Sequence, residues 1–133
     1  QLGQVPAVAW ALLGANILWT IAYDTEYAMV DRDDDRKIGI RTAAILFGRF
    51  DVLAVMGFHA AFLAALAAIG AHLDLGWPYY AGLAIAIVPI GYQYSLIRTR
   101  ESACCFRAFL NNNWVGAAVF AGIALALALR RGL

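Results

Sequence analysis

The sequence predicts an all-α protein, a multi-span transmembrane helical bundle of about four spans. The first reason is composition, because 63% of the 133 residues are apolar and only 14% are charged, against roughly half and roughly a quarter in soluble domains. The second is that the apolar residues gather in four runs, each near the roughly 20 residues that cross a bilayer as a helix. The third is that the charged residues lie almost entirely between those runs. An ordinary soluble domain is excluded, the lipid bilayer is an expected partner, and no nucleic acid is.

The apolar runs define the expected spans. They cover residues 5–23, 52–73, 77–97 and 114–129. The first has Pro6 near its start, where a helix tolerates proline, and the third opens with the aromatic cluster 77–80, which suits the headgroup boundary. The fourth is short, but Trp114 and the pair Arg130-Arg131 flank it, and arginine side chains can reach the interface.

The basic residues predict the orientation of the bundle. Eight of the ten Lys and Arg residues lie in the links between spans one and two and between spans three and four, and none lies in the link 70–76. The positive-inside rule therefore places both basic links in the cytoplasm and both termini of the chain on the other side.

An acidic segment follows the first span. Six of the nine acids lie between Asp24 and Asp35, and no proline or glycine interrupts the segment before Gly39. We therefore expect the first helix to continue and to end near Gly39. If it does, Asp24, Tyr27, Asp31 and Asp35 share one face, because offsets of 3, 7 and 11 residues return close to the starting direction.

Carboxylates repeated on one helix face repel each other unless a cation lies between them. Mg²⁺ fits, because it takes oxygen ligands and commonly bridges one or two carboxylates to phosphates. Lys37 and Arg41 follow and are able to bind phosphate oxygens. A solvated acidic turn, with these basic residues serving only topology, stays open as the alternative. A calcium-binding EF-hand starting at Asp31 is excluded, because Arg36 and Thr42 stand where it needs Gly and Glu.

The remaining polar residues indicate structural roles. Cys104 and Cys105 are adjacent, which disfavours a disulfide between them, so both are expected to be free thiols. His59 is expected to be a hydrogen-bonded structural residue, and Asn113 to cap the start of the fourth helix. The link 98–107 is expected to form an interfacial turn or lid near anionic headgroups.

The run from Tyr23 to Asp35, continuing as Lys37-Ile38-Gly39-Ile40 and as 44–48, resembles the second aspartate-rich region of the UbiA-type intramembrane prenyltransferases. Within them it is similar to the bacterial 4-hydroxybenzoate polyprenyltransferases of ubiquinone biosynthesis, and stretches 15–19, 76–80 and 105–113 add support. The resemblance implies a nine-span helical enzyme, of which residues 1–133 hold the last four spans as the C-terminal part of one membrane domain. The family's first motif, of NDxxDxxxD type, is absent. This chain is therefore expected to be inactive without the missing N-terminal half of the same polypeptide.

The resemblance also implies a reaction and its residues. The reaction is Mg²⁺-assisted ionisation of a polyprenyl diphosphate, followed by attack of the 4-hydroxybenzoate ring ortho to its hydroxyl, at the cytoplasmic side of the bacterial inner membrane. Asp31 and Asp35 are then the catalytic Mg²⁺ and diphosphate pair, and Asp24 is a flanking metal ligand. Lys37 and Arg41 are the candidates for binding the diphosphate.

Two other functions stay open at this point. One is transfer to another aromatic or quinone-precursor acceptor within the same superfamily. The other is a non-enzymatic cation-transporting bundle, which the sequence disfavours because the acids lie beyond the first apolar run instead of at mid-membrane. Tyr27 is able to hydrogen-bond a carboxylate, to face the carbocation, or to serve only as an interface aromatic residue.

Overall fold

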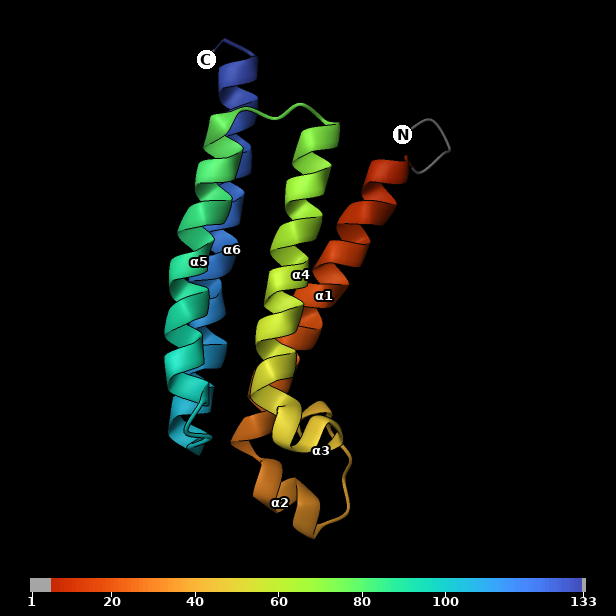
Figure 1. The fold of residues 1–133 in the computed structure, drawn as a ribbon, viewed down its shortest axis with the longest axis vertical. Coiled ribbons are helices and arrows are strands. Elements are labelled where there is room, and N and C mark those ends of the chain that lie inside the picture. The colour runs from red at the N-terminus through yellow and green to blue at the C-terminus, as the bar shows by residue number, and fades with distance from the viewer. Residues whose placement is uncertain (1–5, 133) are drawn as a thin grey trace.

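The fold, seen here in a computed structural model, is described for residues 6–132, and over that range it is helical with no strand (Figure 1). The helices are α1 (Ala7–Val30), α2 (Arg32–Lys37), α3 (Ala43–Phe47), the 3₁₀ helix η1 (Gly48–Phe50), α4 (Asp51–His72), α5 (Trp77–Ile97) and α6 (Ser102–Arg130). Four of them, α1, α4, α5 and α6, are long and apolar enough to cross a membrane. The predicted four-span helical bundle is therefore confirmed.

The four long helices alternate in direction, so the two basic links lie together. The segment from α2 to η1 and the short α5–α6 link lie at one end of the bundle, and the α4–α5 link lies at the other with the described ends of the chain (Figure 1). Helix α1 contacts α4 and α6, and α5 contacts α6 along most of its length. One end of the bundle is therefore strongly charged.

Glycine allows α5 and α6 to approach closely. A Cβ atom built on Gly82 would lie 2.8 Å from the Ala118 carbonyl oxygen and 2.8 Å from Gly122 Cα. Helices in a bilayer gain little from apolar burial against each other, so close backbone packing at small residues contributes much of their association. The Gly82–Gly122 contact therefore stabilises this pair.

The outer surface of the bundle is apolar. Leu53, Val88 and Phe120, from α4, α5 and α6, are each about 70% exposed (68%, 72% and 72%). Large apolar side chains on the outside suit a helix that faces lipid or another apolar helix, and would be unfavourable in water.

Two predicted boundaries change. Helix α1 extends into the acidic segment but ends at Val30 instead of near Gly39, and α6 begins at Ser102 instead of at residue 114. Asn113 therefore lies within a helix and is not its cap, and the expected turn or lid over 98–107 is reduced to the short link before Ser102. The asparagine run does not mark the start of α6. It lies inside the helix, where the amide of Asn112 is buried and donates a hydrogen bond to Glu26 of α1.

Candidate active site

The aspartate-rich segment lies at the charged end of the bundle, and it is bent. Helix α1 ends at Val30, and Asp31 follows with φ −109° and ψ 16°, outside the helical values, before α2 begins at Arg32. The expected continuous helix to Gly39 is therefore interrupted, although neither proline nor glycine is present. Asp35 N still donates to Asp31 O at 2.8 Å, so these two residues remain one helical turn apart on one face.

The predicted metal ligands are accessible. Asp24 and Asp31 are exposed, and Asp35 is half-buried. Within residues 6–132, no three His, Cys, Asp or Glu side chains lie close enough to hold a metal ion together. These carboxylates are available to a ligand, and the described part of the chain does not gather them into a closed metal centre.

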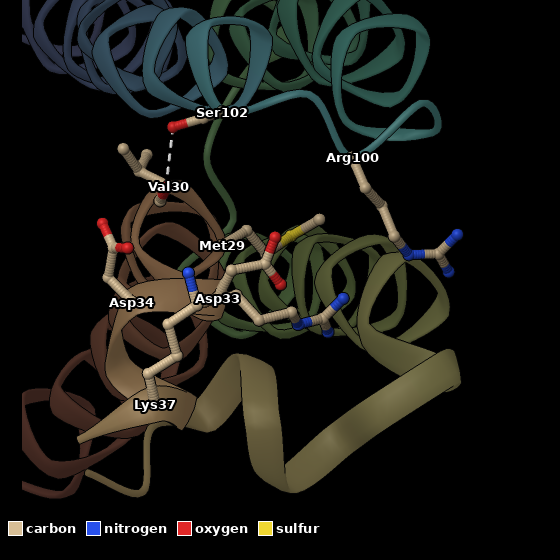
Figure 2. A pocket seen from close by; sticks show the side chains of 8 residues that line it. Met29, Val30, Asp33, Asp34, Lys37, Arg100 and Ser102 are labelled. Atoms are coloured by element: carbon tan, nitrogen blue, oxygen red, sulfur yellow. Dashed lines mark hydrogen bonds between the residues drawn. The ribbon is translucent and has the colours of Figure 1, made fainter. Parts of the chain in front are cut away.

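Lys37 lies at a cavity, whereas Arg41 lies elsewhere. A cavity of about 520 Å³ opens between α2 and the start of α6, lined by Met29, Val30, Arg32, Asp33, Asp34, Lys37, Arg100 and Ser102. Figure 2 shows Lys37 pointing toward Asp33 and Asp34, its neighbours one turn back on α2. Arg41 instead lines a separate concavity of about 300 Å³ with Ile45 and Leu46. The structure therefore does not bring the two predicted diphosphate ligands to one cavity.

Two arginines that line this cavity, Arg32 and Arg100, bind a carboxylate that the sequence did not mark. Asp51, the first residue of α4, is fully buried. Arg32 Nη2 lies 2.5 Å from Asp51 Oδ2, and Arg100 Nη2 lies 2.8 Å from Asp51 Oδ1. Arg100 Nε also donates to both carboxylate oxygens, at 3.0 and 3.1 Å. We call Asp51, Arg32 and Arg100 the charge clamp.

The charge clamp joins α2, the start of α4 and the α5–α6 link, which lie together at this end of the bundle. Arg32 Nη2 also donates to the carbonyl oxygens of Ala44 (2.7 Å) and Gly48 (3.0 Å), and Arg100 Nη2 donates to Arg49 O at 3.1 Å. The hydrogen bonds to Asp51 raise the pKa of Arg100 above its ordinary value. Both guanidinium groups are therefore engaged within the protein.

A second polar cluster lies deeper, where α1, α4, α5 and α6 meet. The carboxyl group of Glu26 is buried and accepts a hydrogen bond from Asn112 Nδ2 at 2.6 Å, and Asn112 Oδ1 accepts one from Trp19 Nε1 at 3.0 Å. The amide nitrogen of Gln93 faces Glu26 Oε2 at 2.9 Å and His59 Nε2 at 3.0 Å, because the opposite orientation would place the amide oxygen against the carboxyl group. The prediction that His59 is a hydrogen-bonded structural residue is confirmed.

Aromatic side chains cover the neighbouring face of α1. The Trp19 ring stacks on Phe62 at 5.4 Å, and the Tyr27 ring lies 5.0 Å from Phe109. A cavity of about 260 Å³ beside them is lined by Trp19, Tyr23, Phe109, Leu110, Asn112 and Asn113. Such walls suit an aromatic ring or an apolar chain. Tyr27 is half exposed.

Sequence reasoning missed Asp51, Arg100 and Glu26 as residues that organise this end of the bundle. A signal existed for Glu26, because it follows Ala22 by four residues and Ala15 by eleven, which puts it on the buried face of α1. No comparable signal marks Asp51, since an acid just before an apolar run ordinarily lies at the interface. Its burial depends on two arginines that are distant in the sequence.

The geometry at this end of the bundle combines accessible carboxylates, a cavity between polar segments and an apolar, aromatic-walled helical body. The UbiA prenyltransferase family matches residues 1–121. This chain therefore belongs to the UbiA prenyltransferase family.

Individual relatives are similar over nearly the whole chain. It is 61% identical over 127 residues to a 4-hydroxybenzoate octaprenyltransferase of Cupriavidus pinatubonensis, covering 96% of this chain and 45% of that protein. The protein of the same name from Nitrosospira multiformis is 62% identical over 125 residues, covering 94% of this chain and 43% of the relative. The chain therefore spans less than half the length of these relatives. No solved structure matches it.

Proposed function

We propose that this chain is the C-terminal part of an enzyme that transfers a polyprenyl group to the ring of 4-hydroxybenzoate, ortho to the hydroxyl, in ubiquinone biosynthesis. The observation that carries this proposal is the 61% identity over 127 residues to a protein named 4-hydroxybenzoate octaprenyltransferase. The same name makes octaprenyl diphosphate the donor to test first. Another aromatic acceptor remains the alternative within the family.

In this proposal Asp31 and Asp35 hold Mg²⁺ and the diphosphate, and Asp24 is a flanking ligand. The donor set fits, because Mg²⁺ takes carboxylate oxygens one or two at a time and keeps its other positions for phosphate oxygens and water. The exposure of Asp24 and Asp31 and the shared face of Asp31 and Asp35 leave their oxygens open to such a ligand. Bound there, Mg²⁺ supplies positive charge to the diphosphate oxygens as the carbon–oxygen bond breaks.

Lys37 and Arg41 are the proposed cationic partners of the diphosphate. Lys37 lines the 520 Å³ cavity, whose acidic lining residues are Asp33 and Asp34 and not Asp31 or Asp35. An ammonium group there is able to compensate the charge of a departing diphosphate. Arg41 lies farther along the link, and its side chain is exposed. Lys37 is therefore the better supported of the two.

The long apolar helices contribute to the proposed reaction by excluding water from it. An allylic cation is short-lived in water, so it must react where water is excluded. The aromatic side chains of Trp19, Tyr23 and Phe109 line a cavity near Asp24, together with Leu110 and two asparagines, and aromatic rings are able to stabilise positive charge. The same surface accommodates isoprenoid units by apolar contact.

We further propose that the charged end faces the cytoplasm at the bacterial inner membrane and that this chain alone is inactive. Eight of its ten basic residues lie in the two links at that end, which the positive-inside rule assigns to the cytoplasm. The relatives are more than twice as long as this chain, and no three-ligand metal cluster forms within residues 6–132. The remaining ligands are expected from the rest of the polypeptide.

The test is a prenylation assay with the full-length protein in membranes. Wild type, supplied with octaprenyl diphosphate and 4-hydroxybenzoate, is expected to form the prenylated ring product with Mg²⁺ and none after EDTA treatment. Asp31→Asn and Asp35→Asn are each expected to lower the rate on the order of 100-fold. Asp74→Asn, the same change at an exposed acid at the opposite end of the bundle, is the matched control and is expected to keep the rate.

Two results would contradict the proposal. Full activity in both Asp31→Asn and Asp35→Asn would remove these residues from the metal site. Transfer to a different aromatic acceptor, with none to 4-hydroxybenzoate, would replace the proposed substrate with the alternative one.

A further inference from the structure

The direction of α2 is not set by α1. The backbone leaves the helical conformation at Asp31, and α2 itself has only six residues, none of them buried. A helix this short has little stability of its own. Its direction must therefore come from contacts with other elements.

Arg32 supplies those contacts. Its guanidinium group binds Asp51 and the carbonyl oxygens of Ala44 and Gly48, and its side chain is only 16% exposed. Among the described residues, no other side chain of α2 forms a hydrogen bond or an ion pair with another element. Arg32 is thus the polar tether that holds α2 to the start of the second span.

Asp51 is held in place independently of α2. Its backbone begins α4, where the helix dipole favours a carboxylate, and Val52 N donates to Asp51 Oδ1 at 2.7 Å. Arg100 reaches the same carboxylate from the α5–α6 link with φ +60°, a left-handed conformation that non-glycine residues adopt infrequently. The link thus adopts an unfavourable backbone conformation that directs the arginine at Asp51.

This tether sets the rotation of α2 about its own axis. Asp31 precedes Arg32 by one residue and Asp35 follows it by three, so at about 100° per residue their side chains lie within about 40° of each other. Turning α2 by a single residue would move the Asp35 carboxylate by about 100° and change its position relative to Asp31, which precedes the helix. We propose that Asp51 is a positioning residue for prenyl transfer: by holding Arg32, it fixes the direction in which Asp35, and Asp31 next to Arg32, present their carboxylates to Mg²⁺ and the diphosphate. This inference rests on the proposed function.

The test is Asp51→Asn in the full-length protein, with two measurements. The first is hydrogen exchange of the backbone amides of residues 31–37 in the enzyme without Mg²⁺ or substrate. Exchange there is expected to quicken about tenfold or more, because a neutral amide cannot hold both guanidinium groups, while the four spans keep their protection. The second is kinetics: the Mg²⁺ concentration for half-maximal rate and the KM for octaprenyl diphosphate are expected to rise about 10- to 100-fold. The KM for 4-hydroxybenzoate is expected to stay the same.

Controls separate positioning from a general loss of structure. Asp74→Asn makes the same chemical change at the opposite end of the bundle and is expected to behave as wild type. Asp51→Glu keeps the carboxylate and is expected to recover part of the Mg²⁺ affinity. If Asp51→Asn does not fold, Arg32→Gln replaces it, with Arg36→Gln as the matched control, because Arg36 is an exposed arginine on the same short helix.

Wild-type exchange at residues 31–37 in Asp51→Asn, or in Arg32→Gln where that variant replaces it, would overturn the inference. So would an equal loss of protection throughout the bundle, or equal rises in the KM of both substrates. The exchange measurement needs no activity, so it decides the tether even if wild type fails to prenylate 4-hydroxybenzoate. That failure would refute the proposed function separately.

Discussion

Replacing Gly82 with alanine is expected to force α5 and α6 apart. The new Cβ would lie 2.8 Å from the Ala118 carbonyl oxygen, 2.8 Å from Gly122 Cα and 3.2 Å from Gly122 N. Carbon atoms pack best at about 3.5–4.0 Å, so the two helices must separate locally by roughly 1 Å. All three neighbours are backbone atoms, which cannot turn away as a flexible side chain does.

The expected cost follows from two opposing contributions. Overpacking of this kind costs about 1–3 kcal/mol, and the upper half of that range applies because the contacts are with backbone. Alanine regains about 1 kcal/mol over glycine within a helix. The free energy of unfolding is therefore expected to fall by about 1–2 kcal/mol in Gly82→Ala.

Equilibrium unfolding of the full-length protein in mixed detergent micelles, followed by far-ultraviolet circular dichroism, measures this change. Gly91→Ala is the matched control on the same helix, since a Cβ atom added at Gly91 would meet no described atom within 4 Å. It is expected to be neutral or to stabilise the protein by up to about 1 kcal/mol. Equal stability of Gly82→Ala and wild type would refute the close approach of α5 and α6.

Three further predictions concern buried groups. Glu26→Gln is expected to stay within about 1 kcal/mol of wild type because it still accepts a hydrogen bond from Asn112, whereas Glu26→Leu leaves that buried amide without its acceptor and costs about 1–3 kcal/mol. The same detergent unfolding assay compares them. Tyr79→Phe removes the hydrogen bond from the buried hydroxyl to a carbonyl oxygen of α4 and is expected to cost about 1 kcal/mol; a cost near zero would show that this bond is not formed. Cys104 is partly exposed and Cys105 fully buried, so maleimide is expected to label Cys104 first, and equal rates by mass spectrometry would contradict their different burial.

The span assignment could be read from the sequence because it depends on local composition. A helix satisfies its own backbone hydrogen bonds, so a long apolar run in a bilayer has few alternatives, and the runs at 52–73 and 77–97 match α4 and α5 closely. The start of α6 could not be read in this way. Asn112 lies inside that helix because Glu26 of α1 accepts its hydrogen bond, and an acceptor 86 residues away leaves no local signal.

Some features of the candidate site could likewise be read from the sequence, and others could not. The acidic segment and the shared face of Asp31 and Asp35 follow from spacing along one helix. The bend at Asp31 does not, because no residue there breaks a helix by its own conformational preference. The position of Lys37 at a cavity, and of Arg41 away from it, likewise depends on how the links fold back.

The sequence by itself determined the membrane-spanning helices, the family and the placement of the acids at one end of the bundle, because hydropathy and spacing act over a few neighbouring residues. The tertiary structure alone decided that Asp51 is buried between Arg32 and Arg100. A carboxylate loses its favourable hydration when it is buried, and only cations brought from other parts of the chain compensate that loss. In the positioning role that we propose for Asp51, these contacts fix the direction of α2 and with it that of Asp35.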